Sequence, residues 1–217
     1  MGNKSVTLGK VPPPLAASMT FNTFKIPTSY RPDHQKALTY AQEAATAFAA
    51  YPDGWLAFFG GHGSGKTHLA VAIAGEQIQK GKKVYYFHVA DLLDHLRHTF
   101  RPDSTIAYDR LFEEVKTADI LVLDDLGLEK TTPWAEEKLR QLFGHRYDYR
   151  LPTVITTALT VPKVEENKLE GIAPIVSRLR DKSVCHLVNL DAPDYRVSGR
   201  VQGRKSPPGR DAQRSRS

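Results

Sequence analysis

A glycine-rich stretch that ends in lysine and threonine carries the clearest chemistry in this sequence. Residues 60–67 read GGHGSGKT and fit the pattern G-x-x-x-x-G-K-[ST]. Glycines let backbone N–H groups turn toward phosphate oxygens, and the N-terminus of a following helix adds partial positive charge. In such a loop the Lys66 ammonium contacts the β- and γ-phosphates, and the Thr67 hydroxyl binds Mg²⁺. The stretch predicts a nucleotide-phosphate site formed by Gly60, Gly61, His62, Gly63, Ser64, Gly65, Lys66, Thr67 and His68.

Two adjacent aspartates supply the second part of a phosphate-handling site. Asp124 and Asp125 follow an apolar run at residues 120–123. If that run is a strand of a parallel sheet, its carboxyl end lies beside the phosphate loop. We expect Asp124 to orient the Mg²⁺ shell and Asp125 to polarise an attacking water. The alternative is an acidic turn before Gly127 that takes no part in catalysis.

The elements that must position these residues are strands and helices in alternation. Runs of apolar and β-branched residues predict five strands, at residues 55–59, 83–89, 120–123, 153–157 and 183–190. Helix signals predict a first helix from about residue 33 to the turn at residues 52–54, and further helices at residues 67–80, 91–100, 105–117, 133–149, 162–168 and 173–180. Apolar strands separated by helices indicate an α/β fold, with a parallel five-stranded sheet and helices on both faces.

Length and charge limit the organisation of the chain. It has 217 residues, 41% of them hydrophobic, which is enough for one full-sized domain. The net charge is +6, but residues 198–217 alone hold six basic residues and one acidic residue, so residues 1–197 are close to neutral. We expect a flexible lead-in at residues 1–20, a folded domain at 21–197 and a basic disordered tail at 198–217. The tail is either a phosphate-binding segment or a solvated terminus.

Cysteine count and hydropathy exclude several classes of protein. The one cysteine, Cys185, rules out an internal disulfide and a cysteine-rich zinc site. No apolar run approaches the ~18–20 residues of a membrane span, and the N-terminus has no signal-peptide core. We therefore expect a cytoplasmic protein with no membrane partner. The aromatic run Tyr85-Tyr86-Phe87 has the residue types that stack on bases, but we interpret it as the core of a strand.

The chain from about residue 20 to residue 197 resembles the ATPase domain of the DnaC/IstB-like family, within the AAA+ superfamily of P-loop NTPases. The resemblance rests on the order and spacing of short stretches at residues 23–24, 60–69, 89–93, 121–127, 134–137, 146–147, 152–157, 177–179 and 194–196. It implies an AAA+ core that binds ATP with Mg²⁺, and homo-oligomers that assemble head to tail with ATP at the interface. It also implies a DNA-associated partner, since family members load the replicative helicase or assist a transposase.

The resemblance also assigns a residue that acts on a neighbouring subunit. Arg178, in Ser177-Arg178-Leu179, matches the position of an arginine finger, which would reach the γ-phosphate across the interface. A guanidinium suits this role because it is always charged and forks onto phosphate oxygens. The alternative is a surface arginine paired with Asp181 or Glu170.

Two departures from the family pattern bear on catalysis. Relatives often read Thr-(Ser/Thr)-Asn after the fourth strand, where the superfamily places the polar residue called sensor 1. This chain has Thr156-Thr157-Ala158, so Thr157 is our candidate and simple strand packing is its alternative role. Many hydrolytic relatives carry glutamate where this chain has Asp125. Aspartate is one methylene shorter, so it would hold the attacking water less well, which favours slow hydrolysis. We expect this hydrolysis to be stimulated by a partner or by DNA.

Both ends of the core also depart from larger relatives. We expect no helical lid domain after Arg196, and Arg196 is either the substitute for the lid's sensor or a surface residue. Helicase loaders of this family usually carry an N-terminal helicase-binding domain, whereas about 20 irregular residues precede this core.

The leading interpretation is a helicase-loader-like ATPase of DNA replication that assembles on a helicase and on single-stranded DNA. The alternatives are an IstB-like transposition helper, a small-molecule P-loop kinase and a module that binds ATP without hydrolysing it. Arg97, His98 and Arg101 lie where related AAA+ proteins carry an extra helix on the DNA-facing side of the assembly.

Overall fold

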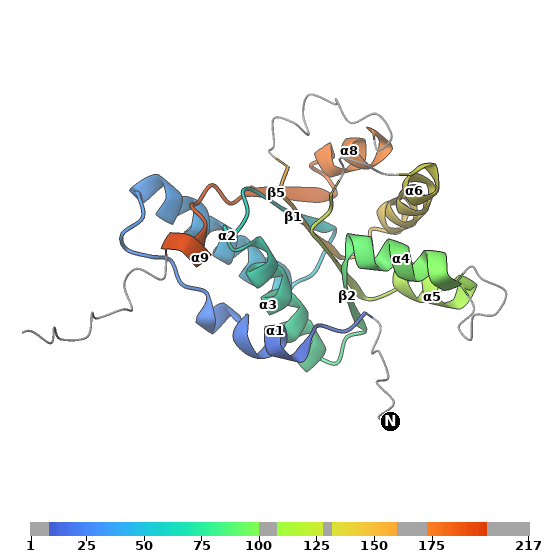
Figure 1. Cartoon of the computed structure of the whole chain (residues 1–217), viewed down its shortest axis with the longest axis horizontal. Coiled ribbons are helices and arrows are strands. Elements are labelled where there is room, and N and C mark those ends of the chain that lie inside the picture. The colour runs from blue at the N-terminus through green and yellow to red at the C-terminus, as the bar shows by residue number, and fades with distance from the viewer. Residues whose placement is uncertain (1–8, 100–107, 128–131, 160–172, 199–217) are drawn as a thin grey trace, which may run out of the picture.

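A five-stranded parallel sheet forms the centre of the molecule (Figure 1). The computed structural model describes residues 9–99, 108–127, 132–159 and 173–198. The strand order is β2-β3-β4-β1-β5, and every neighbouring pair is parallel. The strands are β1 (Trp55–Phe59), β2 (Val84–His88), β3 (Ile120–Asp124), β4 (Thr153–Thr157) and β5 (Cys185–Asn189). This confirms the predicted parallel five-stranded sheet.

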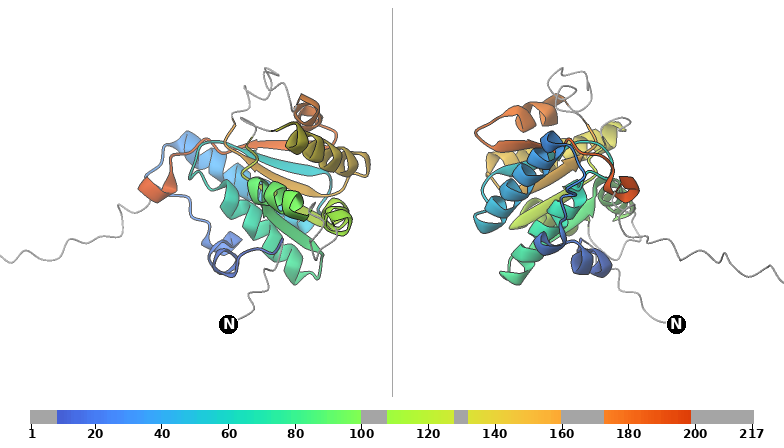
Figure 2. Two further views of the ribbon diagram at one scale, coloured as in Figure 1. Left: turned by 45° about the vertical axis from the view of Figure 1, so that its right-hand side comes forward. Right: turned by 90° about the vertical axis from the view of Figure 1, so that its left-hand side faces the viewer.

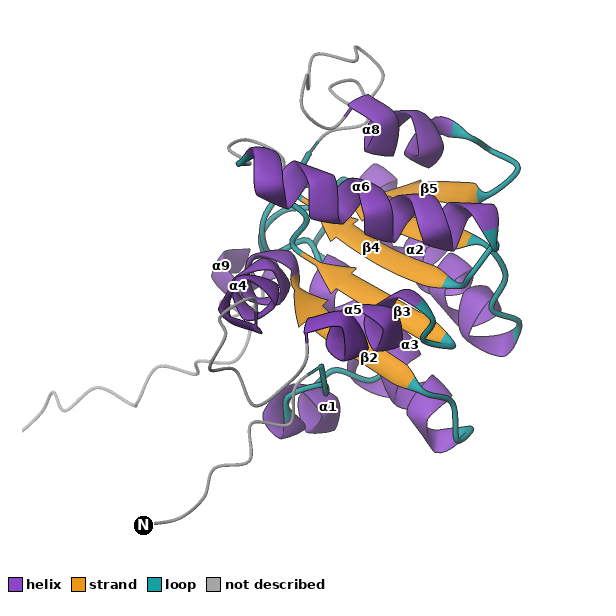
Figure 3. Cartoon of the chain, turned by 90° about the vertical axis from the view of Figure 1, so that its right-hand side faces the viewer, coloured by secondary structure: helices purple, strands orange, loops and turns teal. Residues whose placement is uncertain are grey.

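Helices cover both faces of the sheet, as Figure 3 shows. One face packs against α2 (Pro32–Ala50) and α3 (Lys66–Gln79). The other packs against α4 (Val89–Thr99), α5 (Tyr108–Lys116), α6 (Pro133–Asp148) and α8 (Ala173–Arg180). The predicted helix at 162–168 and the chain between the predicted helices at 91–100 and 105–117 lie outside the described residues.

The two-residue period of the strands decides which face each side chain joins. Leu56, Phe58, Val122 and Val154 pack on the side of α2 and α3. Ala57, Phe59, Leu121 and Ile155, their neighbours along the strands, pack on the side of α4, α5, α6 and α8. The same alternation continues to the carboxyl ends of the strands, where it sorts the polar side chains of the site.

The segment before α2 is ordered from residue 9, where the structure begins to describe it, whereas the sequence predicted a flexible lead-in over residues 1–20. It contains α1 (Pro13–Ser18) and a 3-10 turn, η1 (Phe21–Thr23). The carbonyl oxygen of Gly9 accepts a hydrogen bond from the N–H of Tyr86 on the edge strand β2. Val11 is buried against the same core, and α1 lies beside α3 (Figure 2). Tertiary packing therefore orders a proline-rich stretch that has no helical periodicity.

The C-terminal part of the described chain returns to the phosphate loop. In that part, β5 is followed by α9 (Tyr195–Ser198), and residues 199–217 lie outside the described residues.

No helix in the described ranges is long and apolar enough to cross a membrane.

Candidate nucleotide-binding site

The phosphate loop runs from the carboxyl end of β1 to the first turn of α3, as the motif requires. Gly65 is the N-cap of α3 and has a φ of 108°, a conformation that favours glycine. Gly63 has a φ of 71°, and a Cβ there would lie 1.9 Å from Oδ1 of Asp194. The turn and the close approach of the C-terminal segment both depend on these glycines.

The lysine of the loop is folded into its centre. Lys66 is only 8% exposed, and its Nζ donates hydrogen bonds to the carbonyl oxygens of Gly60 (2.8 Å) and Gly61 (2.7 Å). Burial lowers the pKa of Lys66, while the negative charges of Asp125 and Asp124 oppose that shift. The loop therefore holds a buried cation beside the two aspartates.

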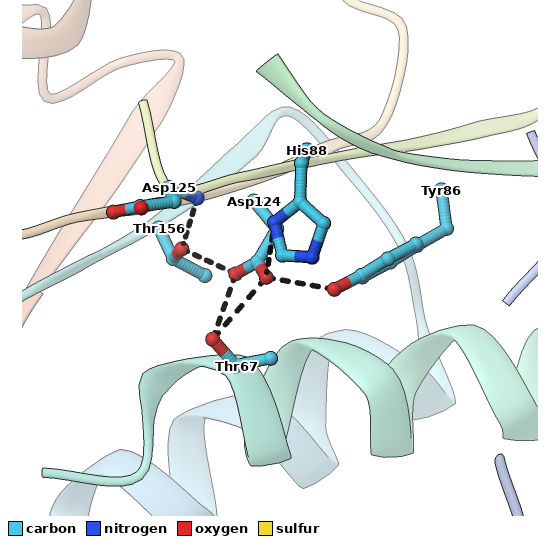
Figure 4. A network of polar contacts seen from close by, with 6 residues as sticks. All are labelled: Thr67, Tyr86, His88, Asp124, Asp125 and Thr156. Atoms are coloured by element: carbon cyan, nitrogen blue, oxygen red, sulfur yellow. Dashed lines mark hydrogen bonds and ion pairs between the residues drawn. The ribbon is translucent and has the colours of Figure 1, made fainter. Parts of the chain in front are cut away.

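The carboxylate of Asp124 is fully buried at the end of β3 and joins the loop to the sheet (Figure 4). The hydroxyl of Thr67 donates to Oδ1 at 2.9 Å and lies 3.2 Å from Oδ2. The hydroxyl of Thr156, at the end of β4, donates to Oδ1 at 2.6 Å. The two residues expected to share a metal ion are thus in direct contact.

Two side chains from the neighbouring strand β2 contact the same carboxylate. The Tyr86 hydroxyl donates to Oδ2 of Asp124 at 2.7 Å, and Nδ1 of His88 lies 3.3 Å from Oδ2. Burial, together with the charge of Asp124, raises the pKa of Tyr86, so its hydroxyl stays a donor. Tyr86 is buried, as expected of strand core. The polar contact itself was not predicted from the sequence, in which no motif marks His88.

The carboxylate of Asp125 lies in a different environment from that of Asp124. It is exposed, and its φ of 55° is in the left-handed region, which aspartate tolerates better than most residues. Its backbone N–H donates to Oγ1 of Thr156 at 2.9 Å. The turn at Asp125 therefore ends the strand and separates this carboxylate from the buried one before it.

Thr157, the candidate for sensor 1, makes its hydrogen bonds away from Asp124. Its hydroxyl is buried, donates to the carbonyl oxygen of Leu126 at 2.8 Å and accepts from the N–H of Leu159 at 3.2 Å. Because side chains alternate along β4, Thr157 faces away from Asp124 and Thr156 faces toward it. The structure thus brings Thr156, and not Thr157, to the network.

Arg178 lies on α8 and is not among the residues that line the cleft described below. Its Nη1 donates to the carbonyl oxygen of Pro174 at 3.0 Å, and its guanidinium lies 5.5 Å from the centre of the Tyr147 ring. Asp181, proposed above as its surface partner, instead accepts hydrogen bonds from Tyr147 and Ser183. Glu170, the other suggested partner, lies outside the described residues.

A cleft of about 480 Å³ opens beside the phosphate loop. One wall comes from the segment before α2 and the other from the segment after β5. The second wall is held to the start of α2, where Nδ1 of His34 donates to the carbonyl oxygen of Asp191 (2.7 Å). The lining residues are Ser18, Met19, Thr23, Phe24, Lys25, Tyr30, Leu38, Gly63, Ser64, Gly65, Lys66, Thr67, His68, Pro193, Tyr195 and Arg196.

Each wall is anchored to the loop. The Nε2 of His68 donates to the carbonyl oxygen of Thr20 (2.9 Å), and Phe24 packs edge-on against the His68 ring. Burial lowers the pKa of His68. On the other side, the N–H of Tyr195 donates to the carbonyl oxygen of Gly63 (3.0 Å). Arg196 thereby comes to the cleft, next to the loop.

Comparison with known proteins gives a match over most of the chain. A family model described as "IstB-like ATP binding protein" matches residues 35–203. The replicative helicase loader DnaC of Escherichia coli K12 is 29% identical over 192 residues, which are 86% of this chain and 74% of the relative. An ATP-binding protein of the insertion sequence IS5376, from Geobacillus stearothermophilus, is 28% identical over 142 residues, 64% of this chain and 54% of that protein.

Solved structures agree on the fold. The crystal structure of the DnaC helicase loader matches with a TM-score of 0.66 and 24% identity, over 80% of this chain and 97% of that one. The expected fold class, an α/β fold with a parallel five-stranded sheet and helices on both faces, is thus confirmed.

Proposed function

The chain belongs to the family of IstB-like ATP-binding proteins, and from that premise we propose that it is an ATPase that acts as a helicase-loader-like protein in DNA replication. The observation that carries the proposal is the contact between Thr67 at the start of α3 and the buried Asp124 at the end of β3. This contact places a hydroxyl and a carboxylate side by side at the mouth of the phosphate loop.

The residues at this mouth fit a nucleotide triphosphate with a divalent cation. Hydroxyl and carboxylate oxygens are the ligands that Mg²⁺ prefers, and Thr67 and Asp124 supply both. Bound Mg²⁺ would neutralise charge on the β- and γ-phosphates. Lys66 would exchange its two carbonyl contacts for phosphate oxygens, and Asp125 would orient the attacking water from its exposed position.

The cleft suits the rest of the nucleotide. Its volume is within the range of small-molecule sites, and it continues from the phosphate loop between the two walls. Phe24 and Tyr30 from the first wall offer aromatic surface for a base. Arg196, from the second wall, adds a positive charge beside the loop.

The proposed assembly of subunits depends on Arg178, which lies on α8 away from this cleft. We propose that it serves the nucleotide of a neighbouring copy, so that ATP bridges subunits head to tail. The similarity to DnaC supports the replicative helicase as partner. The single-stranded DNA contact is proposed from the basic residues 198–217 and from Arg97 on α4.

A transposition helper is the second candidate function. It is favoured by the family description and by the similarity to an insertion-sequence protein. The kinase alternative has no such support.

Co-purification separates the two candidates. The full chain is mixed with the replicative helicase or with the transposase of the same host, with ATP, with ADP and without nucleotide, and ATP turnover is measured with and without single-stranded DNA. We expect an ATP-dependent complex with the helicase, and turnover stimulated by DNA. A complex with the transposase alone would favour the second candidate, and ATP-independent behaviour with both would contradict the proposal.

A further inference from the structure

The edge strand β2 reaches the buried carboxylate of Asp124 through two side chains. In the parallel register of β2 and β3, His88 pairs with Asp124 and Tyr86 pairs with Val122. Tyr86 and His88 are two residues apart, so both project from the face of β2 that also presents Asp124. Their rings meet edge to face at 5.7 Å.

Both contacts fall on the same oxygen. Oδ2 of Asp124 accepts from Tyr86 and lies at ion-pair distance from His88. Oδ1 is the oxygen nearer to Thr67, at 2.9 Å against 3.2 Å for Oδ2 (Figure 4). The two oxygens are therefore distinguished by their partners, and rotation of the carboxylate would break both contacts from β2.

Packing alone does not explain these residue types. A phenylalanine would fill the buried position of Tyr86 without a hydroxyl that needs a partner. The side chain of His88 is 47% exposed, so burial does not hold it in place. Its ring instead lies over a carboxylate with no exposed surface.

We propose that Tyr86 and His88 are positioning residues for metal binding: they hold Oδ2 of Asp124 and so keep Oδ1 turned toward Thr67 and the Mg²⁺ site. This inference rests on the proposed nucleotide-binding function. Residues that orient a ligand in this way typically contribute 10–100-fold to metal affinity. The two contacts therefore raise the affinity for Mg²⁺, and they change the affinity for nucleotide without Mg²⁺ very little.

The test is a titration of MgCl₂ against binding of a fluorescent ATP analogue, followed by anisotropy, with a parallel series in EDTA. The variants are Tyr86→Phe and His88→Leu. His88→Asn is the conservative variant, because its amide nitrogen can occupy a place near that of Nδ1. The matched control is Tyr85→Phe, which removes the neighbouring hydroxyl that binds Glu114 at 2.5 Å, away from Asp124.

We expect Tyr86→Phe and His88→Leu to need about 10-fold more Mg²⁺ for half-maximal enhancement of binding, with EDTA affinities within about 2-fold of wild type. His88→Asn should recover much of the loss, and Tyr85→Phe should behave as wild type. Unchanged Mg²⁺ dependence in folded His88→Leu would overturn the inference, and this exposed position tests it even if Tyr86→Phe does not fold. A wild-type chain that binds no nucleotide under either condition would instead contradict the proposed function.

Discussion

At the scale of single residues, the site is organised around a carboxylate with no exposed surface. Burying an ionised carboxylate is costly unless hydrogen bonds and charges compensate. Asp124 is contacted by Thr67, Tyr86, His88 and Thr156, and each of these comes from a different position on α3, β2 or β4. The consequence is a preorganised site, in which losing one partner leaves a buried oxygen under-bonded.

The two threonines at the end of β4 give a matched pair of variants. Thr156→Val removes the donor to Asp124 and the acceptor for the N–H of Asp125, so we expect ATP turnover to fall on the order of 10-fold. Thr157→Val removes only the contacts to Leu126 and Leu159. It should cost about 1 kcal/mol of unfolding free energy and leave turnover near wild type. Steady-state turnover and urea denaturation of both variants check this, and a larger loss of turnover in Thr157→Val would instead support Thr157 as the sensor residue.

Arg146 is a second buried charged residue, and its role is structural. Its guanidinium donates to the hydroxyl of Thr153 and to the carbonyl oxygens of Val115, Lys116, Ala118 and Pro152. Burial lowers its pKa to about 9, so it remains charged at neutral pH. These bonds tie α6 to the chain before β3 and to the start of β4.

Lysine cannot reproduce the fork of donors that Arg146 presents. We expect Arg146→Lys to lower the free energy of unfolding by about 3 kcal/mol or more, since each buried acceptor left without a partner costs about 1–3 kcal/mol. Urea denaturation measures the change. Arg140→Lys, at an exposed position on the same helix, is the control and should stay within about 0.5 kcal/mol of wild type. An equally small effect at Arg146 would contradict this assignment.

At the scale of elements, the phosphate loop is enclosed by segments from both ends of the described chain. In the segment before α2, Phe24 packs against Gly65 and His68. The segment after β5 packs on the loop through Asp194 and Tyr195. The order of strands and helices followed from hydrophobic periodicity, because the strands are rich in apolar and β-branched residues and the helices that cover the sheet carry an apolar face. The two enclosing segments could not be predicted, since residues 9–20 and 190–196 have no such period and are ordered by contacts distant in sequence.

The register of the sheet set a second limit on prediction. Motif spacing was sufficient to select Lys66, Thr67 and Asp124. Tyr86 and His88 belong to the site because β2 lies next to β3 with His88 opposite Asp124. One sequence does not specify that pairing, although polar residues two apart at a strand's carboxyl end are the signal that could have drawn attention to them.

Glycine substitutions test how closely the C-terminal segment packs on the loop. At Gly63 a Cβ would meet the carboxylate of Asp194, and the φ of 71° is strained for alanine. At Gly61 nothing lies within 4 Å of the same atom. We expect Gly63→Ala to weaken binding of a fluorescent ATP analogue by about 10-fold, since a left-handed alanine costs about 1–2 kcal/mol before any displacement of the segment. Gly61→Ala should bind like wild type, and equal losses in the two variants would argue against this packing.

At the scale of the whole molecule, the residues proposed for catalysis are divided between two places. The loop, the acidic pair and the cleft lie together, whereas Arg178 lies on α8 against Tyr147. Such a division is what an assembly with shared sites requires, because one copy supplies the nucleotide and the next supplies the arginine.

Mixing variants tests the shared site. Arg178→Ala should spare ATP binding and lower turnover on the order of 10³-fold, as loss of an arginine finger does. Asp125→Asn should be inactive because it lacks the carboxylate proposed to orient the attacking water. When the two are mixed, some interfaces pair an intact Arg178 with an intact Asp125, so we expect part of the activity to return. Absence of recovery at every ratio, with assembly confirmed by light scattering, would contradict a role in trans.

Whether residues 60–67 and the buried Asp124 form a site for ATP is tested by the variant Lys66→Ala. Equilibrium binding of a fluorescent ATP analogue is measured by anisotropy for the wild type and the variant, and circular dichroism and thermal melting establish that both are folded. We predict that the wild type binds the analogue, that unlabelled ATP displaces it, and that the folded variant loses binding by about 100-fold or more, as loss of a charged contact to phosphate worth about 3 kcal/mol would give. A folded Lys66→Ala chain with undiminished affinity would be incompatible with ATP binding at this loop.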